Sequence, residues 1–432
     1  NGIVTIKADA AQSLVDETIK ITDAKAQGLV SENGVIKLVS NTGSIEASEI
    51  KIDAGSKGEA TISGKLDVNS SSGKGGDIEI TGKELNLVSA KLSADGKEGG
   101  GKILIGGDWQ GKGDLLQSTY TSINKNSVLS ASATESGAGG TIVAWSNIKD
   151  SNSVTSVYGT LTAKGIDGDG GQIETSGAVL NYNGIKVNTS SLTGNYGNWL
   201  LDPTNITIGS SEASTIASNL GTSDVTQTAT NTITVNNNIA YTGARNANLT
   251  FDATTTVLNA NISSNNGTLS IDINTILEIG ASNTSITTNG GNVDVSGIIR
   301  AVSGETNNFT IDAGAGNVTF SSNVTPAVGD YSAGFTQGNF TSVSDLDFSG
   351  TFLNAINLAG TATTIGDVTF QDGRASNNSI SNANLSFQHE IQNWNNRNYG
   401  NTGLNNIMKG IRWSQGSGNS PYVQFTNASA GQ

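Results

Sequence analysis

The chain has 432 residues, among them 55 Gly, 3 Pro, 1 His and no Cys, and its formal net charge is −14. Without cysteine it can form no disulfide, thiolate zinc site or cysteine nucleophile, and a single histidine excludes sites that need two imidazoles. The negative charge argues against binding to nucleic acid or anionic lipid. No apolar run approaches the ~18 residues that a membrane-spanning helix needs.

A short unit recurs along the chain, in which two small residues precede an apolar-x-apolar pattern. The copies begin at Gly75, Gly100, Gly139, Gly170, Asn266, Gly290 and Ala315. The second residues of the first four copies are 25, 39 and 31 residues apart, and those of the last three are 24 and 25 apart. Alternation over three to five residues predicts half-buried strands. Gly and Asn at the corners would supply the positive φ angles of tight turns.

A period of about 24 residues with three short strands fits one coil of a parallel β-solenoid. The steps of 39 and 31 residues are then coils that carry surface loops. A β-sandwich would use two-residue hairpin loops, which Asn33-Gly34 and Asn183-Gly184 fit but most corners do not. We therefore expect an all-β solenoid, in which Asn side chains at equivalent corners form hydrogen-bonded ladders along the axis.

Composition divides the chain into four segments. Residues 1–115 hold 13 Lys and 17 acidic residues, half of all the charges, and residues 211–384 are rich in Asn and Thr. Residues 116–210 lie between them as a further solenoid segment. Aromatic residues gather in 385–432, where Leu385–Asn398 lacks strand alternation and is expected to be helical or irregular. An open solenoid end needs a cover, so we expect an aromatic C-terminal cap, with a binding head as the alternative.

Residues 100–208 carry the most specific motifs, including Gly-Gly-Lys-Ile-Leu-Ile-Gly-Gly-Asp-Trp from Gly100 and Gly-Gly-Thr-Ile-Val-Ala-Trp-Ser from Gly139. They end in Trp199-Leu200-Leu201-Asp202-Pro203, followed by Ile206-Thr207-Ile208. This order resembles filamentous haemagglutinin-like exoproteins of two-partner secretion, including high-molecular-weight adhesins. The resemblance implies a right-handed parallel β-helix, export through an outer-membrane secretion partner, and adhesion or surface assembly.

The resemblance implies no catalytic role for any residue of these motifs. Trp199, Leu200, Leu201, Asp202 and Pro203 are instead expected to be structural, an apolar plug where coils change shape. It implies a secreted or cell-surface protein of a Gram-negative bacterium, with a host or neighbouring-cell glycan or protein as partner. Because the sequence opens at Asn1 without a leader pattern, we expect the piece to begin inside a longer precursor.

Three groups of residues suggest a chemical site, and each also has a structural interpretation. Asp167 and Asp169, beside Gly165, Gly168 and Gly170, resemble a calcium-binding corner, but the copy is single and a surface loop is the alternative. Four acidic residues and an arginine could line a glycan-cleaving cleft: Asp345, Asp347, Asp367, Asp372 and Arg374. The alternative is that they are ordinary polar residues on the outer face of the solenoid. His389 and Met408 could ligate a haem iron, and the alternative is that His389 is a hydrogen-bonded residue of the surface or of the cap.

The sequence thus favours a non-catalytic, cofactor-free extracellular rod that acts by projection and binding. A self-assembling filament subunit is the alternative, because end coils of a solenoid carry unpaired strands. Its joint would combine Ile3 and Ile6 of an N-terminal strand with aromatic residues of the last segment, namely Trp394, Tyr399, Trp413 and Tyr422. A carbohydrate-active β-helix enzyme is the third hypothesis.

Overall fold

The computed structural model divides the chain into two compact units. The first consists of residues 1–206 and 214–230, and the second of residues 207–213 and 231–432. The structure describes residues 44–281, 284–297, 299–301, 307–313 and 316–320, and elsewhere only the strands given below. The composition boundary at 210/211 lies in residues 207–230, where the chain passes to the second unit at residue 207, returns to the first at 214 and leaves it again after 230. The boundary at 115/116 lies inside the first unit.

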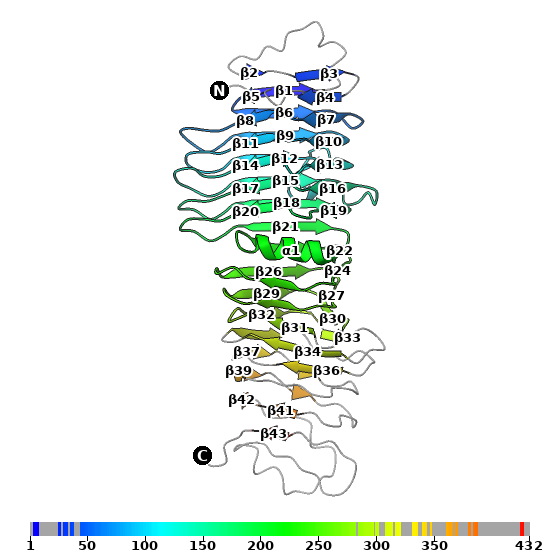
Figure 1. The fold of residues 1–432 in the computed structure, drawn as a ribbon, viewed down its shortest axis with the longest axis vertical. Helices are drawn as coiled ribbons and strands as arrows, with labels where there is room; N and C mark the ends of the chain where they lie inside the picture. Colours follow the sequence, from blue (N-terminus) through cyan, green and yellow to red (C-terminus); the bar gives the residue numbers. More distant parts are fainter. Residues whose placement is uncertain are drawn as a thin grey trace. The chain divides into compact units, whose positions relative to one another are not determined.

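The first unit is a parallel β-solenoid, in which each full coil gives one strand to each of three sheets (Figure 1). Sheet 1 contains, in spatial order, β1 (Ile3–Lys7), β6 (Glu49–Asp53), β9 (Asp77–Thr81), β12 (Lys102–Ile105), β15 (Thr141–Trp145), β18 (Gln172–Gly177), β21 (Asn198–Pro203) and β23 (Asp224–Thr228). Sheet 2 contains β2 (Lys25–Ala26), β5 (Ser44–Glu46), β8 (Lys65–Asp67), β11 (Lys91–Ser93), β14 (Val128–Ser130), β17 (Thr160–Thr162) and β20 (Lys186–Asn188). Sheet 3 contains β3 (Leu29–Glu32), β4 (Val35–Leu38), β7 (Glu59–Ile62), β10 (Glu84–Leu87), β13 (Tyr120–Ile123), β16 (Val154–Val157) and β19 (Val179–Asn181).

Strand register confirms the repeat that the sequence predicts. Asp77 of β9 pairs with Lys102 of β12, which pairs with Thr141 of β15, which pairs with Gln172 of β18. These partners reproduce the steps of 25, 39 and 31 residues between the repeated glycines. The 39-residue coil is lengthened by residues 106–117, and the 31-residue coil by residues 147–153, as expected for coils with surface loops.

The core is a column of inward side chains that stack in register. Ile78, Ile103, Ile142, Ile173 and Trp199 are register neighbours in sheet 1, and each is 0% exposed. In-register stacking places like side chains about 4.8 Å apart, so the apolar column has no break between coils. Burial of this column supplies the main favourable free energy of the fold.

The N-terminal end of the first unit uses antiparallel pairs. β3 pairs with β4 with Leu29 opposite Leu38, and β2 pairs with β5 in the same antiparallel sense. The strands on either side of Asn33-Gly34 thus pair as a hairpin, which the dipeptide fits in sequence. Asn183-Gly184 fits the same pattern but joins no hairpin, because β19 and β20 belong to different sheets and Gly184 (φ +76°) lies at a corner between them.

The second unit is also built of parallel strands. Sheet 4 contains β26 (Ala247–Asp252), β29 (Leu269–Ile273), β32 (Val293–Val295), β35 (Asn317–Phe320), β37 (Asn339–Val343), β39 (Gly360–Ile365) and β42 (Ala383–Phe387). Sheet 5 contains β22 (Ile206–Ile208), β24 (Thr232–Val235), β27 (Thr255–Leu258), β30 (Ile276–Ile279) and β33 (Ile299–Ala301). Sheet 6 contains β25 (Ile239–Tyr241), β28 (Ile262–Ser264), β31 (Thr284–Thr287), β34 (Asn307–Asp312) and β36 (Tyr331–Phe335). Two short pairs follow, β38 (Leu346–Asp347) with β40 (Val368–Thr369), and β41 (Ser379–Ser381) with β43 (Gln424–Thr426).

Asparagine ladders between coils, which the composition predicts, are present in this unit. Asn259 Nδ2 donates to Asn236 Oδ1 at 2.8 Å, and Asn261 Oδ1 accepts from Ser285 N at 2.8 Å. Asn266 Nδ2 likewise donates to the carbonyl of Thr242 at 2.8 Å. Each bond joins residues 23 or 24 apart, so each connects one coil to the next.

One helix, α1 (Ser210–Asn219), interrupts the strand pattern in residues that the sequence assigns mainly to the Asn/Thr-rich solenoid segment. Its last residue, Asn219, covers the free edge of sheet 2 beside β20. Asn219 Oδ1 accepts from Val187 N at 2.7 Å, while its Nδ2 donates to the carbonyls of Ile185 (3.0 Å) and Thr215 (2.8 Å). The amide thereby replaces a neighbouring strand, because the buried backbone of β20 would otherwise lack partners.

Replacing Asn219 by alanine is expected to lower the free energy of unfolding by about 3 kcal/mol, because it leaves a buried N–H and a buried C=O without partners. Chemical denaturation followed by circular dichroism measures the loss. Ser218→Ala is the matched control, since Ser218 is exposed on the same helix turn and should change stability little. Equal midpoints for the two variants would contradict the edge-covering role.

The C-terminal segment lies almost entirely outside the described residues, and so does the expected aromatic cap. The expectation of helix or irregular structure from Leu385 is wrong at its start, because Leu385–Phe387 belong to strand β42, which pairs in parallel with β39.

Candidate functional site

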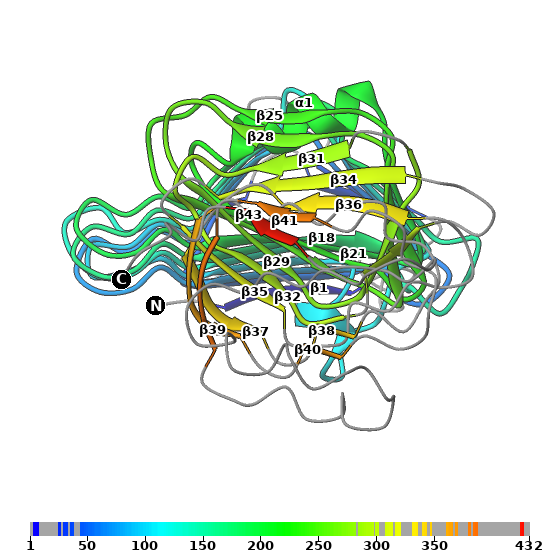
Figure 2. The same ribbon diagram turned by 90° about the horizontal axis from the view of Figure 1, so that it is seen from below.

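Five loops follow the sheet 2 strands of the first unit and stack on one another as a ridge. We call them the corner loops, and they comprise residues 68–76, 94–101, 131–140, 163–171 and 189–197. They project to the left of the sheet 2 strands in Figure 1, and are seen end-on at the left of Figure 2. The last glycine of each loop closes it, as when Gly140 N donates to the carbonyl of Ala131 at 2.7 Å.

These closing glycines are required because the neighbouring coil leaves no room for a Cβ atom. A Cβ on Gly101, Gly140, Gly171 or Gly197 would overlap the carbonyl oxygen of the equivalent glycine one coil earlier. None of these four has a positive φ, so the expectation that the repeated glycines supply left-handed turns is wrong for them. We call Gly76, Gly101, Gly140, Gly171 and Gly197 the glycine ladder. It lets the backbones of successive coils approach more closely than any side chain would allow.

Both calcium candidates lie in the fourth corner loop, and their carboxylates face opposite neighbours. Asp167 Oδ1 accepts a hydrogen bond from Gly137 N of the loop before, and Asp169 Oδ1 accepts from Asn195 N of the loop after at 2.8 Å. Each therefore fastens one loop to the next. Among the described residues, no group of three or more His, Cys, Asp or Glu side chains is arranged to hold a metal ion.

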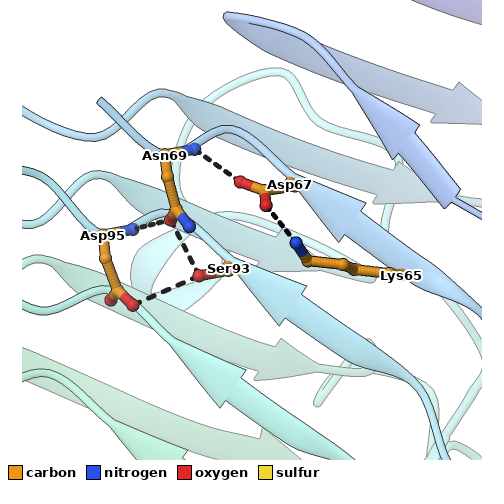
Figure 3. Close-up of polar contacts among 5 residues, drawn as sticks. All are labelled: Lys65, Asp67, Asn69, Ser93 and Asp95. Atoms are coloured by element: carbon orange, nitrogen blue, oxygen red, sulfur yellow. Dashed lines mark hydrogen bonds and ion pairs between the residues drawn. The ribbon is translucent and has the colours of Figure 1, made fainter. Parts of the chain in front are cut away.

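A polar side-chain ladder lies at the base of the corner loops (Figure 3). Asn69 Oδ1 accepts from Asp95 N and from Ser93 Oγ, both at 2.7 Å. Asp95 Oδ1 in turn accepts from Ser132 N at 2.7 Å, which extends the ladder to the following coil. Lys65 forms an ion pair with Asp67, whose Oδ1 accepts from Asn69 N at 2.9 Å. These bonds occupy the carboxylates with structural partners.

The ridge ends in an exposed apolar side chain. Leu192, at the tip of the fifth corner loop, is 76% exposed, more than any other large hydrophobic residue whose burial is described. Val179 of β19 is 45% exposed on a different face of the same unit. Single exposed apolar residues are common on protein surfaces. Leu192 is distinguished by its position on a projecting loop, where a partner can reach it.

A glycine-rich segment covers the outer face of sheet 1. We call residues 106–117 the strap, and four of its glycines have positive φ: Gly106, Gly107, Gly111 and Gly113. Its Trp109 and Leu115 pack on a cluster of outward residues, Leu104, Val143 and Trp145.

The strap and Trp145 are also joined by hydrogen bonds. Trp145 Nε1 donates to Gln117 Oε1 at 3.1 Å, and Gln117 Nε2 donates to the Gly111 carbonyl at 3.0 Å. The strap therefore buries a face of the sheet that would otherwise meet water.

Glu174 lies beneath the strap and is 0% exposed. It is the register neighbour of Val143 on one side and Leu200 on the other, so it belongs to the outward row that the strap covers. Its Oε2 accepts from Gln110 N of the strap at 2.7 Å, and its Oε1 accepts from Ser176 Oγ at 3.0 Å. Burial, with smaller contributions from the charges of Asp202 and Asp108, raises the pKa of Glu174 to about 7, although these two hydrogen bonds lower it.

The Trp-Leu-Leu-Asp-Pro motif forms β21. Trp199 is buried, contacts the ring of Tyr182 edge-on at 5.7 Å, and donates from Nε1 to Thr175 Oγ1 at 3.0 Å. Leu201 and Pro203 are also buried, whereas Leu200 joins the strap-covered face and Asp202 is half-buried beside Glu174.

Other candidates are only partly placed. Ile3 and Ile6 lie in β1, in register with Glu49 and Ile52. Strand β38 includes Asp347. The remaining joint, cleft and haem candidates lie outside the described residues: Trp394, Tyr399, Trp413, Tyr422, Asp345, Asp367, Asp372, Arg374, His389 and Met408.

Sequence reasoning missed the strap and Glu174, although a signal was present. Lys102–Ile105, Thr141–Trp145 and Trp199–Leu201 each contain consecutive apolar residues where a surface strand should alternate. A broken alternation in adjacent coils indicates that both faces of the sheet are covered. The glycine-rich insertion after Ile105 is the segment long enough to cover the outer face.

The stacked parallel sheets define each unit as a parallel β-solenoid. No family model matches the sequence, and no curated protein matches it either. Over the part of the chain that the structure describes, no helix is long and apolar enough to cross a membrane.

Proposed function

We propose that the chain is a segment of a secreted, non-catalytic adhesin-like rod, which presents the corner loops to a glycan or protein on another cell. The observation that carries the proposal is the ridge itself. Five loops are held in register by the glycine ladder and by side-chain bonds between coils, and they project from a close-packed solenoid. Rigid loops lose little conformational entropy on binding, which favours recognition by a repeated surface.

The polar side chains at these loops also support binding over catalysis. Asp167 and Asp169 hold backbone groups of neighbouring loops, and Asp95 holds Ser132, so none of them converges on an open cleft. Glu174, the described carboxyl with the strongest burial, is covered by the strap. The resemblance to two-partner-secreted adhesins suggests the same function, with export through an outer-membrane partner.

The test measures binding of the purified chain to a printed array of host and bacterial surface glycans, and to whole cells. We expect binding that Leu192→Asp lowers at least roughly ten-fold, because an exposed apolar contact at the tip would become a desolvated charge. Val179→Asp is the matched control, since it makes the same change on another face. Equal losses in both variants would contradict recognition through the ridge, and no binding by the wild type would contradict adhesion.

A second candidate function, end-to-end assembly into a filament, is favoured by β1. Among the described strands of sheet 1, β1 is terminal and pairs in parallel with β6, and none of them pairs with its other edge, which is where a strand of a second copy would add. Electron microscopy over a concentration series tests this. Filaments that lengthen with concentration would support assembly, and discrete particles at every concentration would contradict it.

A further inference from the structure

The strap is fastened to the solenoid through a buried carboxyl group that has no cationic partner. Glu174 offers about four acceptor positions, of which Gln110 N and Ser176 Oγ fill two. The charged groups that face it are both acidic, Asp108 on the strap and Asp202 on β21. Lys112 of the strap is exposed and donates to the side chain of Gln110 at 2.6 Å, away from the buried carboxyl. An ionised carboxylate in this position is poorly compensated.

We propose that closure of the strap is coupled to a proton on Glu174, so that the strap is held more tightly in acid and opens more readily once the carboxyl ionises. Opening would return Glu174 to water and break the bond from Gln110 N, which joins residues 64 positions apart. The strap lies between β12 and β13 and contains no strand, and five of its residues have positive φ, Gln110 at +54° among them, so its opening need not break the strand pairs of the coils.

The sign follows from the two protonation states. Below pH 4.5 Glu174 is neutral with the strap open or closed, so closure has its full advantage. Between pH 4.5 and about 7 the open form is ionised while the closed form still holds its proton, so the advantage falls, and it is lost once the pH has risen through about 7 and the closed form is ionised too. The pKa values of about 7 when covered and 4.5 when exposed limit the change in the opening equilibrium to roughly 300-fold. The inference concerns the conformation of the first unit and does not rest on adhesion.

Hydrogen exchange of the intact chain, read by mass spectrometry between pH 5.5 and 8.5 and corrected for intrinsic exchange, tests the coupling. We expect protection of the Gln110 amide to fall at least roughly ten-fold over this range. Peptides that cover β10 should keep their protection, which separates strap opening from global unfolding. Constant protection of Gln110 in the wild type would overturn the proposal.

Variants identify the responsible group. Glu174→Gln keeps an acceptor for Gln110 N and should show pH-independent protection, whereas the same pH dependence in that variant would overturn the proposal. This variant keeps His389, the one histidine of the chain, so any pH dependence that the histidine causes would persist in it. Asp114→Asn, at an exposed strap position, is the matched control and should behave as wild type.

A second variant keeps the test decisive where Glu174→Gln fails to fold. Ser176→Ala removes a bond that favours the ionised form, so it should move the midpoint of the transition to higher pH. An unchanged midpoint would contradict the coupling.

Discussion

Replacing Gly140 by alanine is expected to destabilise the first unit by about 3 kcal/mol or more. The new Cβ would overlap the carbonyl oxygen of Gly101 in the preceding coil, a backbone atom that cannot rotate away. Relief requires the two coils to separate locally, which would break the bond from Thr141 N to that same carbonyl (3.0 Å). Because each coil contacts its neighbours alone, a fault at one interface affects the stack on both sides. Denaturant unfolding followed by circular dichroism measures the effect.

Gly73→Ala is the matched control for this prediction. Gly73 lies in the first corner loop, its nearest neighbour to a new Cβ is Ser70 Oγ at 3.7 Å, and its φ is not positive. The substitution should be neutral, or stabilise slightly by restricting the unfolded chain. If Gly140→Ala unfolds at the same denaturant concentration as Gly73→Ala, close backbone approach is not what the repeated glycines provide.

The period of the solenoid could be predicted from the sequence because glycine and apolar residues repeat in a fixed order. Gly101, Gly140 and Gly171 mark equivalent points of successive coils, and the strand register confirms their spacing. The physical reason for these glycines could not be predicted in the same way. A glycine needed for space and a glycine needed for positive φ are the same letter in the sequence, and only the neighbouring coil distinguishes them.

Contacts between residues far apart in the sequence, by which one segment covers another, could not be predicted from the repeat pattern either. The bond from Gln110 N to Glu174 joins two different coils, and no local motif encodes it. Helix α1 was missed because its ten residues, mostly Ser, Ala and Thr, resemble the surrounding Asn/Thr-rich strands in composition. Both features depend on what the segment covers, the outer face of sheet 1 in one case and the edge of β20 in the other.

Trp199→Ala should be the most damaging change in the Trp-Leu-Leu-Asp-Pro motif, with an expected loss of about 3–5 kcal/mol. The side chain is fully buried in the core column between Ile173 and Val225, and it packs edge-on against Tyr182. Removal of the indole leaves a cavity that in-register neighbours cannot fill, because their own positions are fixed by the coils on either side.

Trp199→Phe separates packing from hydrogen bonding at the same position. It keeps most of the apolar volume but loses the donor to Thr175 Oγ1, so we expect a loss of about 1–2 kcal/mol. Leu192→Ala, at a residue 76% exposed, should change stability by less than about 0.5 kcal/mol. Thermal and denaturant unfolding of the three variants would establish this order. A Trp199→Ala variant as stable as Leu192→Ala would show that the motif does not support the core.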